Sequence, residues 1–568
     1  MVQVVTHFDR HRVAGGIIRW LGLFLRNLFS TDHKVIGLLY GFTSLFFLLV
    51  GFVLVVIMRW QLAFPGRIAP ETYNGLGAMH GTIMVFLGVV PLAVGAFGNY
   101  LVPLQIGAPD MAFPRINLAS YWFYAVGGVI MLASFFAPGG GPMSGWTSYP
   151  PLADFAPSGQ TFWLFGMLCL IFSSLLGALN FIATIVQLRA PGLTWFRLPF
   201  FVWAQFITAF LLLLAFPALQ AAAVLQGMDR LAHTSFFLPS GLVVSGERLT
   251  GAGDGNVLMW QHLFWFLAHP EVYVLVLPAM GIIAEVITTN IRKPLWGYRL
   301  MVYALFVLGF LSFIVWAHHM FLTGMGTTIS AFFQATTMII SIPSVVILSA
   351  LILALYGGSI RFNTPMLFAL AFMPMFGIGG LTGLPLGLAA TDIPLHDTNY
   401  VVGHFHYLVA PGTIFALFAG IYHWFPKITG RFMNETLGKI HFAGSLVAMN
   451  LIFFPMLIQG LAGVNRRLWD GGASYQLAQP LLFLNTMMSH AAFLLGFFQL
   501  FFIVNLFMSM RRGRVADTNP WHATTLEWAT PTPPLAHGNF ELAPRAYRNP
   551  YEYSVPGAAT DFTPQNMA

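Results

Sequence analysis

The sequence predicts an all-α integral membrane protein with about twelve transmembrane helices. Hydrophobic residues make up 57% of the 568 residues and charged residues only 8%, whereas a soluble domain carries about 25% charged residues. Most of the surface must therefore face lipid. The net charge of +7 does not indicate nucleic-acid binding, because the basic residues stand in short clusters between apolar runs, as membrane topology requires.

Twelve apolar runs are long enough to cross a bilayer, whose core takes roughly 20 helical residues. We expect helices because lipid offers no partners to backbone N–H and C=O groups, and the alternating pattern of barrel strands is absent. The runs lie near residues 36–58, 77–103, 118–138, 160–188, 199–226, 257–289, 297–321, 329–357, 364–386, 398–424, 440–462 and 479–510.

Basic residues between the runs predict the orientation, since cytoplasmic loops collect Lys and Arg. An N-terminus inside places the larger group of loop charges there: Arg115, Arg189, Arg197, Arg292, Lys293, Arg299, Arg361, Lys427, Arg431 and Lys439. Residues 1–35 then form a basic cytoplasmic segment, 36–512 the twelve-helix domain and 513–568 a polar cytoplasmic tail. No removable signal peptide is recognisable, and we expect both termini on the cytoplasmic side of a bacterial inner membrane.

Six histidines lie inside the apolar runs, where an ionisable group is costly and so suggests a function. Because Cys169 is the only cysteine, any metal would be held by histidine or oxygen. The six are His80, His269, His318, His319, His404 and His406.

His404 and His406 are two residues apart, so on a helix they point about 200° apart and face opposite sides. That arrangement suits two separate flat ligands with the helix between them. His80, on another helix, could supply the second axial ligand to one of the two. A haem iron with two histidines is full and only passes electrons, whereas one with a single histidine keeps a site for a gas.

The other three histidines suit copper, which binds neutral imidazoles tightly. His318 and His319 diverge by about 100° on an ideal helix, so both reach one ion only near a bent or frayed helix end. Gly324 and Gly326 follow and would permit such a bend.

Two other interpretations apply to these histidines. A single histidine in a span, such as His80 or His262, is more often a partner in an interhelical hydrogen bond than a ligand. The second interpretation is a proton relay without metal, in a transporter or proton channel. The adjacent pair and the opposed pair are harder to explain in that way.

The motifs AHPEVY, WAHHMF, HDTNYVVGHFHY, MHGTIM and IGAPDMAFPRIN together resemble subunit I of the haem–copper oxidases, of the cytochrome c oxidase type. The match runs from STDHKVIGLLY near residue 30 to NPWHATTLEW in the tail. The resemblance implies a bundle around two haems and one copper that reduces O₂ to water, coupled to proton uptake and proton pumping.

The resemblance also assigns the histidines. His80 and His406 would hold the low-spin haem, and His404 the high-spin haem. The copper, CuB, would be held by His269, His318 and His319. Tyr273 lies one helical turn after His269, on the same face. In the family this tyrosine is cross-linked to the histidine and supplies an electron and a proton to break the O–O bond.

Three arginines and a His–Asp pair have implied roles as well. Arg466 and Arg467 resemble the pair that binds haem propionates through charge-assisted hydrogen bonds. Arg59 resembles a residue that bonds a haem formyl group, which favours haem A over haem O or haem B. His396 and Asp397 resemble a Mg²⁺ site shared with a second subunit, and oxygen ligands suit that ion.

The implied partners are a subunit II that carries CuA, subunit III and other small subunits, with cytochrome c as the electron donor. Quinol-using relatives tend to have asparagine in place of Asp397, so quinol oxidation is the less favoured alternative. Nitric oxide reduction is another alternative, and Tyr273 argues against it because O–O cleavage is what requires that tyrosine.

Protons would follow the family's D pathway, from Asp110 after the second run to Glu271 near the copper ligands. Polar side chains that could line this route are Asn99, Asn117, Ser120, Ser173, Ser174 and Asn180.

The family's second proton pathway uses a lysine in the eighth run, where this sequence has Ile347. Thr337 and Ser344 remain in that run, but neither can carry a charge. We therefore expect the standard K pathway to be absent, so that either the Asp110 route carries all protons or another polar path exists. The missing lysine also keeps nitric oxide reduction open.

Overall fold

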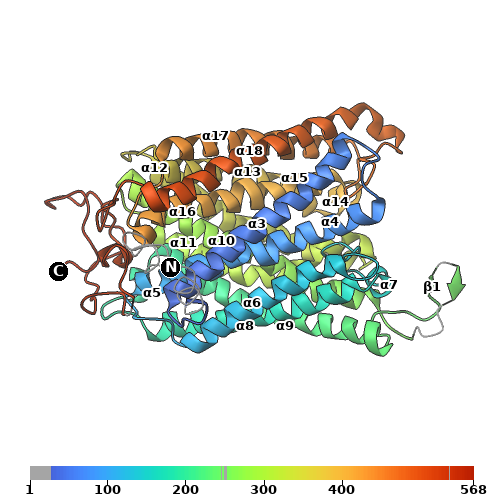
Figure 1. The fold of residues 1–568 in the computed structure, drawn as a ribbon, viewed down its shortest axis with the longest axis horizontal. Helices are drawn as coiled ribbons and strands as arrows, with labels where there is room; N and C mark the ends of the chain where they lie inside the picture. Colours follow the sequence, from blue (N-terminus) through green and yellow to red (C-terminus); the bar gives the residue numbers. More distant parts are fainter. Residues whose placement is uncertain (1–26, 245, 249–252, 537) are drawn as a thin grey trace, which may run out of the picture.

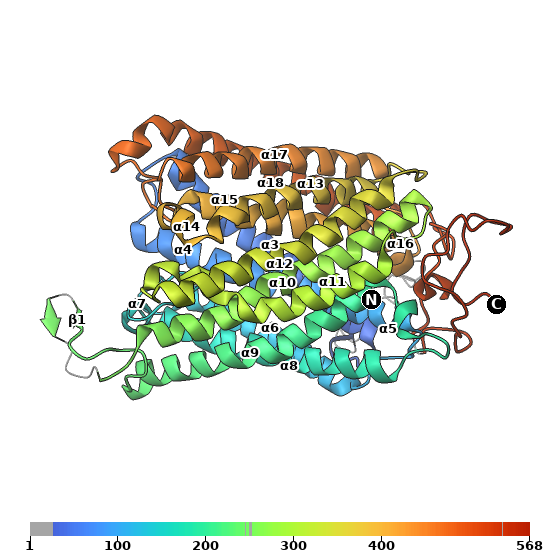
Figure 2. The same cartoon turned by 180° about the vertical axis from the view of Figure 1, so that it is seen from behind.

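The computed structural model describes residues 27–244, 246–248, 253–536 and 538–568. Within these residues, twelve helical spans are long and apolar enough to cross a membrane, which confirms the predicted number. They lie side by side along the longest axis of the molecule (Figure 1), and Figure 2 shows the opposite face, with α10, α11 and α12 in view. The basic residues of the N-terminal segment up to Arg26 lie outside the described residues.

The first six spans lie between the described start of the chain and Ile291. Their elements are α3 (His33–Ala63), α4 (Pro70–Thr82) with η1 (Ile83–Val89), η2 (Pro91–Gly98) and α5 (Asn99–Ile106), α6 (Pro114–Ala133) with η3 (Ser134–Phe136), α8 (Gly159–Gln187), α9 (Phe200–Ala232) and α10 (Val257–Ile291).

The other six spans end at Arg512. Their elements are α11 (Tyr298–Leu311) with η5 (Ser312–Ile314) and η6 (Trp316–Thr323), α12 (Thr327–Leu355), α13 (Thr364–Leu386), α15 (Asn399–Leu408) with η7 (Val409–Ile414) and α16 (Phe415–Thr429), α17 (Glu435–Leu461), and η8 (Gln476–Leu481) with α18 (Leu482–Arg512).

Short elements connect the spans. They are α7 (Leu152–Phe155), η4 (Trp195–Arg197), α14 (Ala389–Leu395) and an antiparallel hairpin of β1 (Val243–Val244) and β2 (Glu247–Arg248). A further short element, η9 (Leu526–Ala529), lies in the tail after the last span.

Irregular helix geometry occurs next to the predicted ligand histidines. The second span changes to π-helix three residues after His80, and the tenth does so three residues after His406. The seventh span changes from α- to 3₁₀-helix before His318 and His319. π-Helical segments are rare in proteins, and those that occur are often at functional sites. The irregular backbone therefore indicates a functional site in the middle of these three spans.

The two ends of the bundle differ. The tail and the described start of the chain lie together at one end, and the β1–β2 hairpin projects from the other (Figure 1). We call these the tail end and the hairpin end. Since twelve spans return the chain to its starting side, the shared position of the two termini agrees with the number of spans.

The tail is docked on the ends of the helices. Leu526, Glu527 and Trp528 are buried. Lys427, near the end of α16, is 0% exposed. Its Nζ donates to the carbonyl oxygens of Thr518 and Thr530, each at 2.9 Å, and to a third oxygen, the Thr532 hydroxyl, at 2.7 Å. A buried ammonium is tolerated only when its donors are satisfied, so this lysine ties the tail to the bundle.

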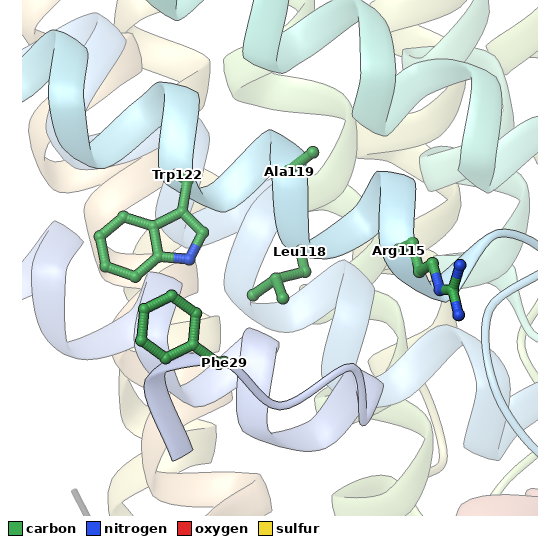
Figure 3. A pocket seen from close by; sticks show the side chains of 5 residues that line it. All are labelled: Phe29, Arg115, Leu118, Ala119 and Trp122. Carbon is green, nitrogen blue, oxygen red and sulfur yellow. The ribbon is translucent and has the colours of Figure 1, made fainter. Parts of the chain in front are cut away.

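A shallow groove lies on the side of α6 near its start (Figure 3). It is lined by Phe29, Arg115, Leu118, Ala119 and Trp122. The Phe29 and Trp122 rings stack with centroids 5.5 Å apart. None of the predicted site residues lines this groove, so the candidate site must be sought among the buried histidines.

Replacing Lys427 with methionine should loosen the tail, because it leaves buried acceptor oxygens without a donor. We expect a loss of about 3 kcal/mol, the upper range for a hydrogen bond to a charged group, measured as a lower Tm in detergent. Lys439→Met, at an exposed position of α17, is the matched control. Equal melting temperatures for the two variants would contradict this role.

Candidate functional site

Three histidines converge in the middle of the bundle. His269 comes from α10, and His318 and His319 come from η6. One ligand nitrogen of each ring lies within 4.8 Å of the others, and the Nε2 atoms of His318 and His319 are 3.1 Å apart. Converging imidazole nitrogens in a buried position are the donor set that copper or zinc takes.

The backbone of η6 explains how two adjacent histidines reach one point. The α-helical part of this span ends at Leu311, and Met320 within η6 leaves helical dihedral angles, with φ −127° and ψ 17°. Gly324 and Gly326 then adopt a positive φ of 80° each. The expected bend is therefore present.

Neighbouring side chains fix these three rings. The Thr337 hydroxyl lies 3.0 Å from Nδ1 of His318. The Trp265 ring stacks on His319, with centroids 3.8 Å apart and planes inclined by 12°. Such contacts hold ligands in the orientation that a metal needs. Tyr273, one turn after His269, has its ring centroid 5.0 Å from that histidine, so the two lie on one face of α10 as predicted.

His80 and His406 form a facing pair. Their ring centroids are 6.5 Å apart and their planes are inclined by only 6°. Nδ1 of His80 donates to the Gly51 carbonyl and Nδ1 of His406 to the Val402 carbonyl, each at 2.8 Å. A carbonyl can only accept, so Nδ1 carries the proton and Nε2 of each ring is free for iron. The pair fits the two axial positions of one haem.

His404 faces the other side of α15. Its Nδ1 donates to the Gly379 carbonyl of α13 at 2.8 Å, which again leaves Nε2 free. A Cβ atom added to Gly383 would lie 2.6 Å from His404 Cε1, so glycine gives this ring its space. His406 instead stacks near Phe453 of α17, with centroids 4.7 Å apart. The two histidines therefore point to different sides, as their spacing predicted.

A family model described as cytochrome c and quinol oxidase polypeptide I matches residues 35–494. The chain belongs to this family. Its members carry haem and copper, so this is a haem–copper oxidase subunit and an integral membrane protein.

Curated relatives match over nearly the whole chain. The alternative cytochrome c oxidase subunit 1 of Bradyrhizobium diazoefficiens is 45% identical over 95% of this chain and 93% of its own. Cytochrome c oxidase subunit 1 of Synechocystis sp. is 44% identical over 94% of each chain. That of Cereibacter sphaeroides is 40% identical over 96% of this chain and 98% of its own.

A solved structure shares the fold. It is described as a heme-copper terminal oxidase dimer, and it aligns with a TM-score of 0.69 at 20% identity over 85% of both chains. At this identity the likeness concerns the arrangement of the helices.

The three predicted haem-contacting arginines of this oxidase subunit take different places. Arg59 is half-buried in α3, and its Nη2 is 3.9 Å from the Met456 sulfur. Arg466 and Arg467 lie at the hairpin end, in the connection after α17, and Arg467 is exposed. Nε of Arg466 donates to Oδ1 of Asp397 at 2.6 Å. Burial alone would raise the pKa of the Asp397 carboxyl, but Arg466, His396 and Arg467 together lower it.

The two predicted magnesium ligands have other partners within the chain. Asp397 is paired with Arg466, and Nδ1 of His396 lies 3.2 Å from Oδ2 of Asp392. Asp392 did not stand out in the sequence, because a carboxylate near a helix end is ordinary. Two residues supply only part of the six-ligand shell that Mg²⁺ takes, so an intact site would need further ligands from outside this chain.

Part of the predicted proton route forms one hydrogen-bonded cluster. The Ser120 hydroxyl donates to the Asn117 carbonyl at 2.7 Å, and the Ser173 hydroxyl to the Ser120 carbonyl at 2.6 Å. The Tyr40 hydroxyl donates to Ser120 Oγ at 3.0 Å. Neither side-chain polar atom of Asn117 has a partner among the described residues. Tyr40 was missed, because a tyrosine in an apolar run resembles a packing residue.

The other predicted members of the route are more scattered. Asn180 accepts from the Phe113 N–H at 2.9 Å and so fixes the loop after Asp110. Asn99 donates back to its own helix, at Gly95, and Ser174 does the same at Leu170. Ser174 is thus not joined to the cluster.

The two ends of the predicted route differ in burial, since Asp110 is half-buried and Glu271 is fully buried. Burial raises the pKa of Asp110 to about 6. Glu271 is 1% exposed, and neither of its carboxyl oxygens has a hydrogen-bond partner in the described part of the chain. Ile347 of α12 is fully buried, so an apolar side chain occupies the position of the lysine.

Replacing His319 with alanine should remove copper, because one of three converging nitrogens is lost. We expect the purified protein to lose most of its copper by elemental analysis while the optical spectrum of its haems persists. His262→Ala is the control, since His262 also lies on α10 but contacts Trp316 and is not part of the converging set. A His319→Ala protein with full copper content would disprove this ligand set.

Proposed function

We propose that this chain is the catalytic subunit of a cytochrome c oxidase that reduces O₂ to water with electrons from reduced cytochrome c. The observation that carries the proposal is the placement of six histidines in three groups. His80 and His406 form a facing pair, His404 points to the opposite side of the helix that carries His406, and the other three histidines converge on one point. This arrangement supports one haem with two protein ligands and a haem–copper pair open to a gas.

The chain would hold and orient these groups. When bound, the haems and the copper supply electron transfer and O₂ binding. The carbonyls of Gly51, Val402 and Gly379 set the tautomers of the three haem ligands. Tyr273 would hold a proton at its phenolic oxygen, beside His269, where O–O cleavage needs one. Its helical position four residues after His269 keeps that oxygen at the copper site.

Partner subunits and finer cofactor details extend this proposal. Arg466 and Arg467 would bind haem propionates at the hairpin end, and Arg59 would contact a formyl group of haem A. His396 and Asp397 would take part in a Mg²⁺ site completed by a subunit II that also carries CuA. Subunit III and smaller subunits would join them in a bacterial inner membrane, with the tail end in the cytoplasm.

The electron donor can be tested on the purified complex with an oxygen electrode. We expect haem bands in the visible spectrum and rapid O₂ consumption with reduced cytochrome c. A quinol should support little O₂ consumption, because quinol-using relatives tend to have asparagine in place of Asp397. If only quinol supported O₂ consumption, the electron donor would be a quinol and not cytochrome c. A purified protein without haem bands would overturn the oxidase assignment.

Asp110→Asn should slow turnover about a hundredfold, the lower end of the range for loss of a proton-transfer group. The carboxyl holds its proton below about pH 6, because burial raises its pKa to that value. Wild-type turnover should therefore fall as the pH rises through 6, and this slope should disappear in the variant. Asp517→Asn, at an exposed position of the tail, should leave rate and slope unchanged. A variant at the full wild-type rate would rule out Asp110 as an entrance.

A further inference from the structure

Two buried carboxyl groups meet at the tail end, away from the predicted proton route. Glu285 lies in the last two turns of α10 and is 3% exposed, and Glu527 of η9 in the tail is 0% exposed. Neither forms an ion pair within the described residues. Buried carboxylates without a cation are rare because the charged form loses its hydration, so this pair calls for an explanation.

Hydrogen bonds connect Glu285 to the tail. The Tyr551 hydroxyl donates to Glu285 Oε1 at 2.5 Å, and the Phe201 N–H donates to the same oxygen at 3.2 Å. The Phe200 N–H in turn donates to the Tyr551 oxygen at 2.7 Å. A tyrosine from the tail is thus placed between the start of α9 and the carboxyl of α10.

Glu527 is only partly satisfied. Its Oε1 accepts from Nε2 of Gln105 at 3.0 Å, and its Oε2 has no partner in the described residues. Burial raises the pKa of Glu527. The Glu285 and Glu527 carboxyls are close enough for their charges to interact.

One cation lies near the pair. Lys427 is close enough for its charge to interact with that of Glu527, although its hydrogen bonds go to three other oxygens of the tail. Arg292 is paired with Asp561. The remaining titratable neighbours are tyrosines, Tyr298, Tyr551 and Tyr553. A single cation can offset the charge of only one of two interacting buried carboxyls, so the two do not ionise together. The pair therefore keeps at least one proton that it can exchange.

Glu285 lies on the same face of α10 as Glu271. The two residues are 14 positions apart, which is about four helical turns with a difference in direction of about 40°. Gly281 lies one turn before Glu285. A Cβ atom at Gly281 would be 2.9 Å from the Phe201 Cα, so α9 and α10 are in close contact next to Glu285.

Further along α9, two buried side chains have polar atoms without partners. Gln205 and Thr208 follow Phe201 and are fully buried, and Nε2 of Gln205 donates to the Ala93 carbonyl of η2 at 2.8 Å. Oε1 of Gln205 and Oγ1 of Thr208 have no hydrogen-bond partner among the described residues. On α10, Pro278 has no N–H, so the Val274 carbonyl loses its helical donor. Hydrogen-bonding groups therefore continue from Glu285 toward Glu271.

We propose that Glu285, with Tyr551 and Glu527, is a second proton-uptake site at the tail end that passes protons inward along the contact between α9 and α10. This proposal rests on the proposed oxidase function, which consumes protons. Each transfer moves one proton from water at the tail end to a carboxyl oxygen and then inward, with no change of oxidation state. The site would supply protons in a chain whose α12 has Ile347 in place of a lysine.

The test compares Glu285→Gln, Tyr551→Phe and the double variant Asp110→Asn/Glu285→Gln with the wild-type complex. Glu552→Gln is the matched control, because Glu552 follows Tyr551 but pairs with Arg548 at the surface. Haem spectra and copper content establish that each variant is assembled. Turnover is measured as O₂ consumption, proton uptake by a pH-indicator dye in a single turnover, and carboxyl protonation by reduced-minus-oxidised infrared difference spectra.

We expect Glu285→Gln to slow proton uptake several-fold and to remove an infrared signal of a protonated carboxyl, which Tyr551→Phe should shift. Asp110→Asn should keep a residual rate that the double variant loses. Assembled double variants that retain the residual rate of Asp110→Asn would overturn the relay, while oxidase activity in the wild type would still stand. If Glu285→Gln does not assemble, an unshifted infrared signal and unchanged proton uptake in Tyr551→Phe would overturn it equally.

Discussion

The cost of burying imidazoles in an apolar bundle governs this structure. A neutral imidazole has one donor and one acceptor nitrogen, and each must find a partner inside the helices. In His80, His404 and His406 the donor is bound by a backbone carbonyl. The acceptor is thereby left for a metal. Because the carbonyls belong to neighbouring helices or turns, the positions of the ligands depend on how those helices pack.

The irregular backbone segments follow from the same constraint. A regular helix would turn His318 and His319 away from each other, but η6 leaves helical dihedral angles at Met320 and ends before Gly324, which has a positive φ. The π-helical segments begin three residues after His80 and His406. Such segments interrupt the helical ladder inside lipid, where unpaired groups are expensive. They are tolerated here because the ligands they help to position are enclosed by the bundle.

The sequence predicted the elements whose signals are local. Apolar length gave twelve spans, and the spacing of His404 and His406 gave their opposite directions. The sequence could not show which distant segments contact one another in the fold. The bond from Tyr551 to Glu285 joins residues 266 positions apart, and neither residue belongs to a recognisable motif. Tyr40 was missed for the same reason, since only the packed helices show that its hydroxyl meets Ser120. The partners of His396 and Asp397 also depend on the fold, because Arg466 and Asp392 reach them through turns.

The tail is held on the bundle by the same kind of buried polar groups that could carry protons. A polar, proline-rich segment has little apolar area with which to dock, so its attachment depends on buried polar partners, chiefly Lys427 and Glu285. Polar groups that hold a segment in place can also carry protons, since both roles require a row of buried donors and acceptors.

The absence of a lysine from α12 removes one row of proton-carrying groups without disturbing the metal ligands, because Ile347 fills the position with apolar volume. A second carboxyl on α10 restores a titratable group on the helix that carries His269, Glu271 and Tyr273. The metal ligands can therefore remain fixed while the surrounding proton supply changes.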